Sequence, residues 1–434
     1  MRRAPWVATQ NDAHARTTAF RLLCLALVIK SVGPGAVNFA TNPHPLPGLD
    51  HAVKFSHLAE LVSALGSALV LLVSAIVVDR YGRTNLYISG GVAMLLILAV
   101  FTQFRMSDDP LKFGSVAAQV SLLAVVLAVC ALRPSLNDLG VIGVAGCVVA
   151  AYSAILYVVR PYNALYFISG SASLAPEKAI VRDIVIAGPM SHSNTLGSFL
   201  ALTFPFIGLW HSRRLRLLGY CVILAVIPLT ASRTALIAVG VLTAFVVLRA
   251  VALPFRARTA GAIILTGVGT LLVYLPLAIT DPTAFSTRVS TWQDALNAWR
   301  SSGSLLLGVG PYWSGALASD TGYAPRTTSG HNLFVHWGVT GGVLMIAVGT
   351  VLLVILSRKA LAIDGERVFP VATGYVLALL TVSITEFALS FTITSQLFVG
   401  TGLAMTALLN VREQPDHGGA LRTHSTHTVG VRPR

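Results

Sequence analysis

The run LAELVSALGSALVLLVSAIVV, residues 58–78, holds one charged side chain, Glu60, near its beginning. A helix of about 20 mainly apolar residues is long enough to cross the hydrocarbon core of a membrane. Three charged residues, Asp79, Arg80 and Arg83, follow the run at once. The run therefore predicts a membrane-spanning helix that ends at a charged loop.

The composition of the whole chain agrees with this interpretation. Of its 434 residues, 55% are hydrophobic and 11% are charged, whereas a soluble domain carries about 25% charged residues. A water-soluble fold of this size could not cover its surface with so few charges. We therefore expect an all-α polytopic membrane protein, and the composition excludes disordered, coiled-coil, collagen-like and small disulfide-stapled chains. The four cysteines lie in apolar runs without CxxC spacing, which argues against a zinc site.

Further apolar runs bounded by charges, Pro or Gly bring the number of expected transmembrane helices to about 12. They cover residues 19–38, 58–78, 86–104, 115–132, 139–159, 192–210, 215–230, 234–250, 259–280, 331–356, 368–388 and 391–410. The transmembrane domain is thus expected over 19–410. It lies between an N-terminal tail, 1–18, and a C-terminal tail, 411–434, whose composition is typical of disorder.

The basic residues indicate how these spans are oriented. If the N-terminus is cytoplasmic, 20 of the 31 Lys and Arg residues fall on the cytoplasmic side and 10 on the outer side, with Lys30 inside the first span. Cytoplasmic loops of membrane proteins carry such an excess. We therefore expect a multi-pass protein of the cytoplasmic (inner) membrane with both tails inside. The basic residues of these loops account for most of the net charge of +14, so the charge does not indicate a nucleic-acid partner.

Most of the outer basic residues belong to two long loops, about 160–190 and 281–330, or lie at the helix ends beside them. Loops of this length are usually functional. In the second loop Trp292 and Trp299 recur at helical spacing, and Ser290 with Gln293 resembles a capping box. We expect a short amphipathic helix at the outer interface, with its tryptophans toward the lipid headgroups or the helix bundle.

The cytoplasmic loops carry little chemistry. They are short and hold neither a DxD motif nor a glycine-rich phosphate cradle. A cytosolic nucleotide substrate is therefore not expected. An enzyme of this design would work on the outer side, on a substrate that brings its own activation as a lipid-linked phosphate or diphosphate.

Three polar clusters are expected on the outer side. They are SHSNTLGSFLAL at 191–202, LTASRTALIAV at 229–239, and a third cluster made of RVSTWQDALNAW at 288–299, LGVGPYWSG at 307–315 and SGHNLFVHWGVTGG at 329–342. Together they resemble the O-antigen ligase and polymerase family, whose members show an H-x-N before one span, an S-R between two spans, and an R…W…GvGp…HN block in the large outer loop. The resemblance covers about residues 185–345.

The resemblance implies an activity. It suggests a metal-independent, inverting glycosyltransferase without a cofactor, which takes a glycan from a polyprenyl-diphosphate-linked donor and transfers it to a glycan or lipid acceptor at the outer face, among membrane lipids. The sequence does not separate a ligase from a polymerase, because both use the same donor and differ in the acceptor.

The residues support the same chemistry independently of the family. A diphosphate leaving group gains negative charge, which guanidinium groups neutralise, and a neutral imidazole can take the proton of an acceptor hydroxyl. His331 is the expected base, because its place at a helix N-terminus disfavours the protonated form. Glu386 is a candidate to orient His331 or to replace it as base. The expected substrate-binding residues are Arg233, Arg288, Asn332, His192, Asn194, Arg182 and Arg326.

Structural interpretations stand beside these roles. A histidine at a membrane interface is often only a hydrogen-bonding helix cap, an interpretation with more weight for His192 than for His331, and Arg182 and Arg326 are equally compatible with solvated loop charges. Arg233 lies between two nearly fused spans, where an arginine is costly unless it faces a polar cavity or a counter-anion.

A twelve-span secondary transporter is the main alternative. Residues 79–83, DRYGR, look like the loop motif of major-facilitator carriers, which follows the second span in that superfamily. Two observations argue against a carrier of this kind. Such carriers have a long cytoplasmic loop between spans six and seven, where this chain has only a short connection, about residues 211–214, and no halfway repeat is visible. A non-catalytic scaffold would leave the outer Arg and His residues unexplained.

Overall fold

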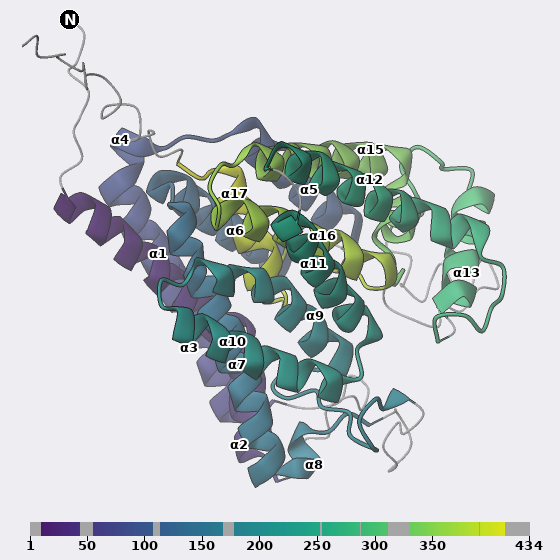
Figure 1. Ribbon diagram of the computed structural model, residues 1–434, viewed down its shortest axis with the longest axis horizontal. Helices are drawn as coiled ribbons and strands as arrows, with labels where there is room; N and C mark the ends of the chain where they lie inside the picture. Colours follow the sequence, from purple (N-terminus) through teal and green to yellow (C-terminus); the bar gives the residue numbers. More distant parts are fainter. Residues whose placement is uncertain are drawn as a thin grey trace, which may run out of the picture.

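The computed structural model describes residues 10–43, 55–106, 113–167, 178–251, 254–286, 288–310, 330–389 and 391–412, and over these the chain is all-α (Figure 1). The α-helices are α1 Gln10–Ser31, α2 Gly33–Thr41, α3 His57–Val77, α4 Arg83–Asn85, α5 Gly90–Met106, α6 Phe113–Leu132, α7 Gly140–Val159, α8 Pro161–Ala164, α9 Ser193–Thr203, α10 Arg213–Val226, α11 Arg233–Val251, α12 Pro254–Ala278, α13 Arg288–Ser301, α15 Leu333–Ala362, α16 Val368–Thr385 and α17 Ala404–Leu409. Short 3₁₀ turns at Leu136–Leu139, Phe204–Leu209 and Ile227–Thr230, and π turns at Val78–Gly82 and Val399–Leu403, extend several of them.

Within the described residues, seven helices are long and apolar enough to cross a membrane. The number becomes eight if the bent pair α1 and α2, which meet at 47°, is one broken span. The chain is therefore a multi-span helical membrane protein, but the twelve spans expected from the sequence are not shown.

The expected spans that fall short are interrupted for local reasons. In 192–210 the α-helix ends at Thr203, and a 3₁₀ turn follows that begins at Phe204 and has Pro205 as its second residue. In 215–230 α10 ends at Val226, before Pro228. Proline lacks the N–H that would continue the α-helical ladder. The run 86–104 forms α5, a helix of 17 residues.

The last expected span, 391–410, becomes helical only at Val399. Before that point Ser395 N–H bonds the Thr392 carbonyl at 2.9 Å, and the Ser395 hydroxyl accepts from Leu397 N–H at 3.2 Å. Such local hydroxyl and turn bonds compete with helix formation. Apolar composition alone therefore does not show which of these runs form helices of spanning length.

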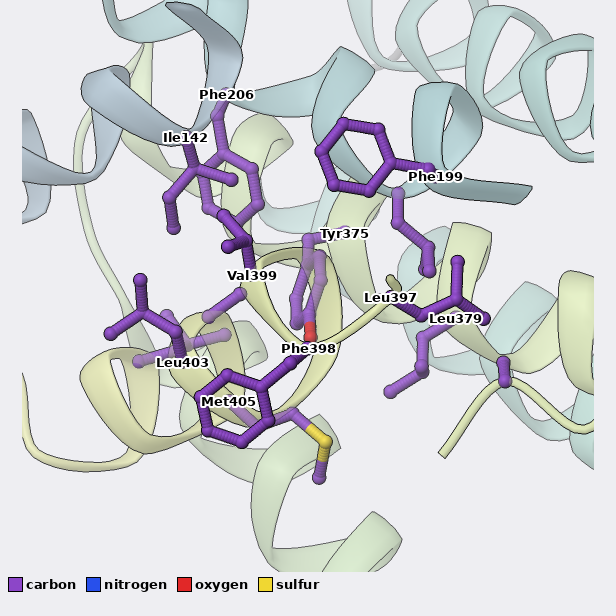
Figure 2. Close-up of a cluster of buried hydrophobic side chains, with 14 of the residues drawn as sticks. Ile142, Phe199, Phe206, Tyr375, Leu379, Leu397, Phe398, Val399, Leu403 and Met405 are labelled. Carbon is purple, nitrogen blue, oxygen red and sulfur yellow. The ribbon is translucent and has the colours of Figure 1, made fainter. Parts of the chain in front are cut away.

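The core of the bundle surrounds α16, the most deeply buried of the candidate spans. Tyr375 of α16 packs against Phe206, with ring centroids 5.1 Å apart, and lies beside Leu397 and Phe398 of the chain that precedes α17 (Figure 2). Because α16 is apolar on all sides, it forms the centre against which the other helices pack. Its last residue, Thr385, and the adjacent Glu386 therefore lie within the protein.

A break in α15 holds the large loop in place. Gly342 has φ 65° and ψ −160° in the middle of this helix, a conformation open to glycine. The amides of Val343 and Leu344 bond the carbonyls of Leu305 and Leu306 at 3.0 and 3.2 Å. The segment 305–309 thus satisfies backbone groups that the break leaves open.

Arg105, at the end of α5, secures the same junction. Its guanidinium donates to the carbonyls of Thr340, at 3.2 Å, and Gly308, at 3.1 Å. Gly308 has φ 67°, and a Cβ there would lie 2.6 Å from the Gly342 nitrogen. The backbone turn at Gly308–Gly310, the GVG part of the large-loop motif, therefore packs against the break in α15.

The expected amphipathic helix exists as α13, at the edge of the bundle (Figure 1). Both tryptophans face the bundle: Trp292 is buried with Val335 and Val339 of α15, and Trp299 packs on Gly338. The expected capping box is not its start, because α13 begins at Arg288 and the Gln293 amide donates to the Thr280 carbonyl at 3.0 Å. This packing fixes Arg288, the first residue of α13, beside α15.

Candidate functional site

A polar pocket of about 180 Å³ lies where four helices begin and α16 ends. It is lined by Lys178, His192, Asn194, Ala231, Arg233, Thr234, Ser286, Arg288, Thr291 and His331. The three predicted clusters, which lie far apart in the sequence, therefore meet around one cavity. We call it the polar pocket.

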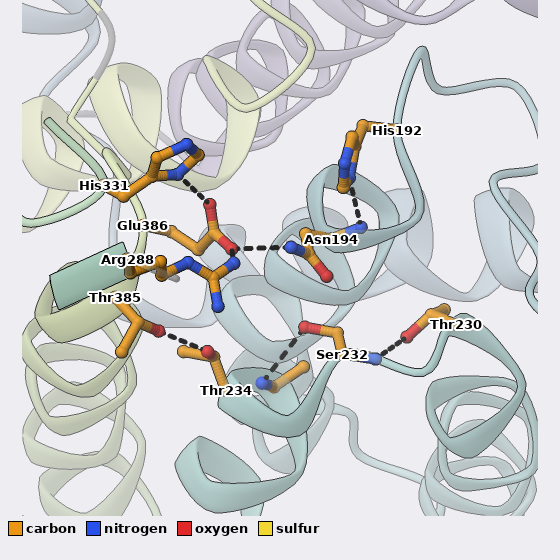
Figure 3. A network of polar contacts seen from close by, with 10 residues as sticks. His192, Asn194, Thr230, Ser232, Thr234, Arg288, His331, Thr385 and Glu386 are labelled. Atoms are coloured by element: carbon orange, nitrogen blue, oxygen red, sulfur yellow. Dashed lines mark hydrogen bonds and ion pairs between the residues drawn. The ribbon is translucent and has the colours of Figure 1, made fainter. Parts of the chain in front are cut away.

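Glu386 joins the first and the third of these clusters (Figure 3). It follows α16 directly in an extended conformation, with φ −136° and ψ 152°. One carboxylate oxygen forms an ion pair with Arg288 and accepts from the Asn194 amide at 2.8 Å. The other lies 3.6 Å from Nδ1 of His331. The Arg288 and Glu386 side chains are 17% and 14% exposed, so this pair is largely removed from water.

The charge of Glu386 depends on these partners. Burial by itself raises the pKa of a carboxyl group. Here Arg288 first, and then His331 and His192, more than offset burial and hold the pKa of Glu386 below its usual value. Glu386 is therefore a carboxylate at neutral pH, and a buried carboxylate keeps the cations around it in place.

His192 lies on the opposite wall and caps a helix. Its Nδ1 accepts from the backbone N–H of Asn194 at 2.9 Å at the start of α9, and its ring packs against Tyr166 with centroids 4.3 Å apart. Burial lowers the pKa of His192 to about 4, although Glu386 opposes the shift. His192 is therefore neutral at pH 7, and its capping bond requires that state.

The link between α10 and α11 brings Arg233 to the pocket. Thr230 ends a 3₁₀ turn, and Ala231 adopts φ 55°. The Ser232 hydroxyl accepts from Ala235 N–H at 3.4 Å and so begins α11. Arg233 is the first residue of that helix and is exposed on the pocket wall. Arg233, whose charge would be unfavourable in an apolar environment between two helices, thus faces a polar cavity.

Three residues with a strained, left-handed backbone conformation also line the polar pocket. Ala231, Ser286 and His331 line the pocket with φ values of 55°, 58° and 45°. Left-handed backbone is unfavourable for residues with a Cβ, and such residues cluster at functional sites, where the surrounding fold holds them. In His331 the strained turn places the ring beside Glu386, with its other nitrogen directed away (Figure 3).

The remaining predicted residues lie elsewhere. Asn332 is buried outside the pocket. Its amide donates to the carbonyls of Leu272 and Ile384 at 3.0 and 2.9 Å, and its oxygen accepts from Val335 N–H as the N-cap of α15. Arg182 is exposed at a tight turn between Val181 and Ile184. Arg326 lies outside the described residues.

Sequence reasoning passed over Lys178, which lines the pocket and places its ammonium 5.6 Å from the Tyr166 ring centre. In the sequence it is one of several basic residues of a loop expected on the outer side, and no motif marks it. Glu386 was predicted from the sequence as a candidate to orient His331 or to replace it as base, whereas its contacts with Arg288 and Asn194, from distant segments, were not predicted.

Comparison with known proteins finds no family model and no curated protein that matches this chain. The arrangement of the polar pocket is therefore the basis for assigning a function.

Proposed function

We propose that this protein is a membrane glycosyltransferase that uses a glycan linked to a polyprenyl diphosphate as donor and an acceptor hydroxyl at the outer face of the cytoplasmic membrane. The observation that carries the proposal is the contact of Arg288 and His331 with one buried carboxylate, Glu386, in a pocket that Arg233 and Lys178 also line. The resemblance of the three clusters to O-antigen ligases and polymerases supports the same reaction, for either kind of acceptor.

The charges of the pocket favour an anionic ligand. Arg233, Arg288 and Lys178 line it, and Glu386 is the carboxylate behind them. Arginine binds phosphate oxygens with two parallel hydrogen bonds, which lysine cannot do. A diphosphate bound by these groups would have its developing charge neutralised as the bond to the sugar breaks.

His331 is suited to the proton transfer. With Nδ1 turned toward Glu386, the other ring nitrogen, Nε2, is free to accept a proton. In the proposed reaction the acceptor oxygen attacks the anomeric carbon and gives its proton to Nε2, and the bond from that carbon to the diphosphate oxygen breaks. The electron pair stays on the polyprenyl diphosphate. Attack opposite the leaving group inverts the anomeric centre, and the step requires no metal ion.

Glu386 acts through its neighbours in this scheme. Its negative charge, 3.6 Å from Nδ1 of His331, favours the tautomer with the proton on that nitrogen, and it holds Arg288 at the pocket when no ligand is present. A bound diphosphate would share or replace its contact with Arg288. Glu386 is therefore a positioning residue, and Asn194, which donates to the same oxygen, supports it.

The carrier alternative gains no support from its own motif. Asp79 and Arg83 form an ion pair at 3.8 Å within one helical stretch, and both side chains are exposed. Such exposed pairs are common at the ends of helices and contribute little.

The direct test of the reaction uses purified protein in lipid nanodiscs, supplied with a polyprenyl-diphosphate glycan and an acceptor glycan or lipid. We expect a new glycosidic bond and release of polyprenyl diphosphate, both unaffected by a chelator. Vesicles that take up a ligand without forming any bond would indicate the carrier.

The proposed sidedness has a separate test, labelling of single cysteines in cells with an impermeant thiol reagent. Cysteine at Ser301, exposed at the end of α13, should react from outside, and cysteine at Ser212, exposed before α10, should not. Both belong in a Cys221→Ser background, because Cys221 is exposed. The reverse pattern would place the polar pocket on the cytoplasmic side and contradict the proposal.

A further inference from the structure

A pocket of about 800 Å³ lies at the end of the bundle opposite the polar pocket. Helix α11 begins at the polar pocket with Arg233 and runs to the other end, and α16 begins at that other end and ends beside Glu386. The pocket lies between the last turns of α11 and the first turn of α16. Its charged lining residues are Arg249, Arg258, Asp364, Glu366 and Arg367. We call it the arginine pocket.

Three arginines from three segments meet in the arginine pocket. Arg249 lies in the last turn of α11, Arg258 near the start of α12, and Arg367 directly before α16. Two carboxylates also line the pocket, and Asp364 forms an ion pair with Arg258. The other two arginines, Arg249 and Arg367, are then opposed by one carboxylate, Glu366. The lining residues therefore carry an excess of positive charge, and guanidinium groups in such a setting bind phosphate oxygens.

An apolar groove of about 440 Å³ continues the arginine pocket between α10 and α11. The two cavities share Val246, Glu366 and Arg367 as lining residues. Because these three residues are exposed, the border between the cavities is open to the surroundings, and one ligand can lie across it. Leu224 of α10 and Val247 of α11 also line the groove and are 44% and 56% exposed. In a candidate span such as α11, exposed side chains of this kind face lipid chains.

The groove is charged at one end and apolar farther along. Arg216, in the first turn of α10, lines it, and one nitrogen of its guanidinium donates to the Trp210 carbonyl at 2.9 Å, which holds the side chain in place. Leu224 lies about two turns farther along the same helix. On another wall Arg367, at the start of α16, marks the charged end. This gradient matches a lipid whose charged head lies at the helix ends and whose chain lies along α10 and α11.

We propose that the arginine pocket and the apolar groove together bind one anionic phospholipid of the membrane, with its phosphate between Arg249 and Arg367 and one acyl chain along the groove. Basic pockets between transmembrane helices bind anionic headgroups in this way. A soluble phosphate would leave the groove unfilled, and a zwitterionic lipid would leave the excess of positive charge unmatched. The site does not depend on the proposed transfer reaction. In the proposed orientation it faces the cytoplasmic leaflet.

The charge is tested by native mass spectrometry of the full chain in detergent, with phosphatidylglycerol and phosphatidylcholine of the same acyl chains. One basic residue near a membrane surface contributes about fivefold to the binding of anionic lipid. The unaltered chain should prefer phosphatidylglycerol, and Arg367→Gln should bind it about fivefold more weakly. Arg213→Gln is the control, because Arg213 is exposed at the start of α10 and lies outside both cavities. Equal losses in the two variants, or no preference for phosphatidylglycerol in the unaltered chain, would overturn the proposal.

The groove is tested by filling it. Val247→Trp places a ring in the groove, and Leu248→Trp is the matched control, because Leu248 is 50% exposed and lies outside both cavities. Burial of one methylene changes affinity about fourfold, so Val247→Trp should weaken phosphatidylglycerol binding about tenfold and Leu248→Trp should leave it within about twofold. Only variants that elute from gel filtration as the unaltered chain does are compared. The same affinity in both variants would contradict an acyl chain in the groove.

Glycerol 3-phosphate separates the two sources of phosphate. In excess it should leave bound phosphatidylglycerol in place, because it lacks the chain that fills the groove. Release of the lipid by this soluble phosphate would assign the arginine pocket to a free anion and overturn the lipid assignment.

Discussion

Arg105 and Arg288 lie at the same end of the bundle and have different surroundings. Arg105 donates to two backbone carbonyls, those of Thr340 and Gly308, and so joins the broken α15 to the large loop. Arg288 pairs with a side-chain carboxylate, Glu386, at the wall of a cavity. Carbonyl groups of the fold keep Arg105 fixed, whereas a phosphate can replace a carboxylate as the partner of Arg288. The comparison separates an arginine that maintains the structure from one that is available to a ligand.

The largest expected effect is the difference between the two arginines in glycan transfer. Loss of one preorganised donor to a developing charge typically costs about 100- to 1,000-fold in rate, so Arg288→Ala should lose at least that much transfer per folded molecule. It should also melt lower, because Glu386 is left without its ion pair. Arg288→Lys should recover little, because an ammonium is a point charge. Arg105→Ala should melt lower but retain transfer within a few-fold per folded molecule.

Transfer rate and thermal unfolding in the same detergent measure both properties. If Arg105→Ala abolished transfer in protein that remains folded, or if Arg288→Ala were fully active, the assignment of a structural role to Arg105 and a ligand-binding role to Arg288 would be wrong.

A smaller effect, on thermal stability, is expected from a substitution of Gly308, whose carbonyl accepts a hydrogen bond from Arg105. Gly308→Ala places a Cβ 2.6–2.8 Å from backbone atoms of α15. Overpacking of this kind costs about 1–3 kcal/mol and should lower the melting temperature by a few degrees. Gly303→Ala is the control, because Gly303 has nearly the same φ, 68°, and open space around its Cβ position. Equal losses in the two variants would assign the effect to backbone strain alone and not to the junction with α15.

The smallest expected effect is on the pH dependence of stability, and it arises from His192 in the polar pocket. Because the pKa of His192 is about 4 when folded and about 6.5 when unfolded, the unfolded chain binds more protons between these values. Stability from this residue is complete above pH 6.5 and declines as the pH falls toward 4. His192→Asn keeps a good N-cap for α9 and removes the titration. Melting curves from pH 7.5 to 4.5 should decline less steeply for this variant, and parallel curves would contradict the assigned state of His192.

The sequence predicted much of this arrangement because it rests on local patterns. Long apolar runs located the spanning helices, and helical spacing around Trp292 located α13. Arg233, Arg288, His331, His192 and Asn194 were named as site residues, and all five line or adjoin one pocket.

Other features depend on contacts that a single sequence does not contain. Asn332 follows His331 directly, but helix capping turns its side chain into the core, which only the geometry reveals. Lys178 reaches the pocket through the fold of a loop with no motif. The twelve expected spans are not all shown among the described residues, because prolines such as Pro205 interrupt the α-helix inside runs that are apolar throughout.

The central claim is that Arg288 binds the donor diphosphate while His331 takes the acceptor proton. It is tested most directly by measuring donor binding and transfer separately on His331→Ala and Arg288→Ala, with labelled polyprenyl-diphosphate glycan and purified protein in nanodiscs. A general base contributes about 100- to 10,000-fold in rate. We expect His331→Ala to bind the donor with unchanged Kd and to lose transfer by that order, and Arg288→Ala to lose both. Normal transfer in His331→Ala, or loss of donor binding in His331→Ala with binding retained in Arg288→Ala, would contradict the account.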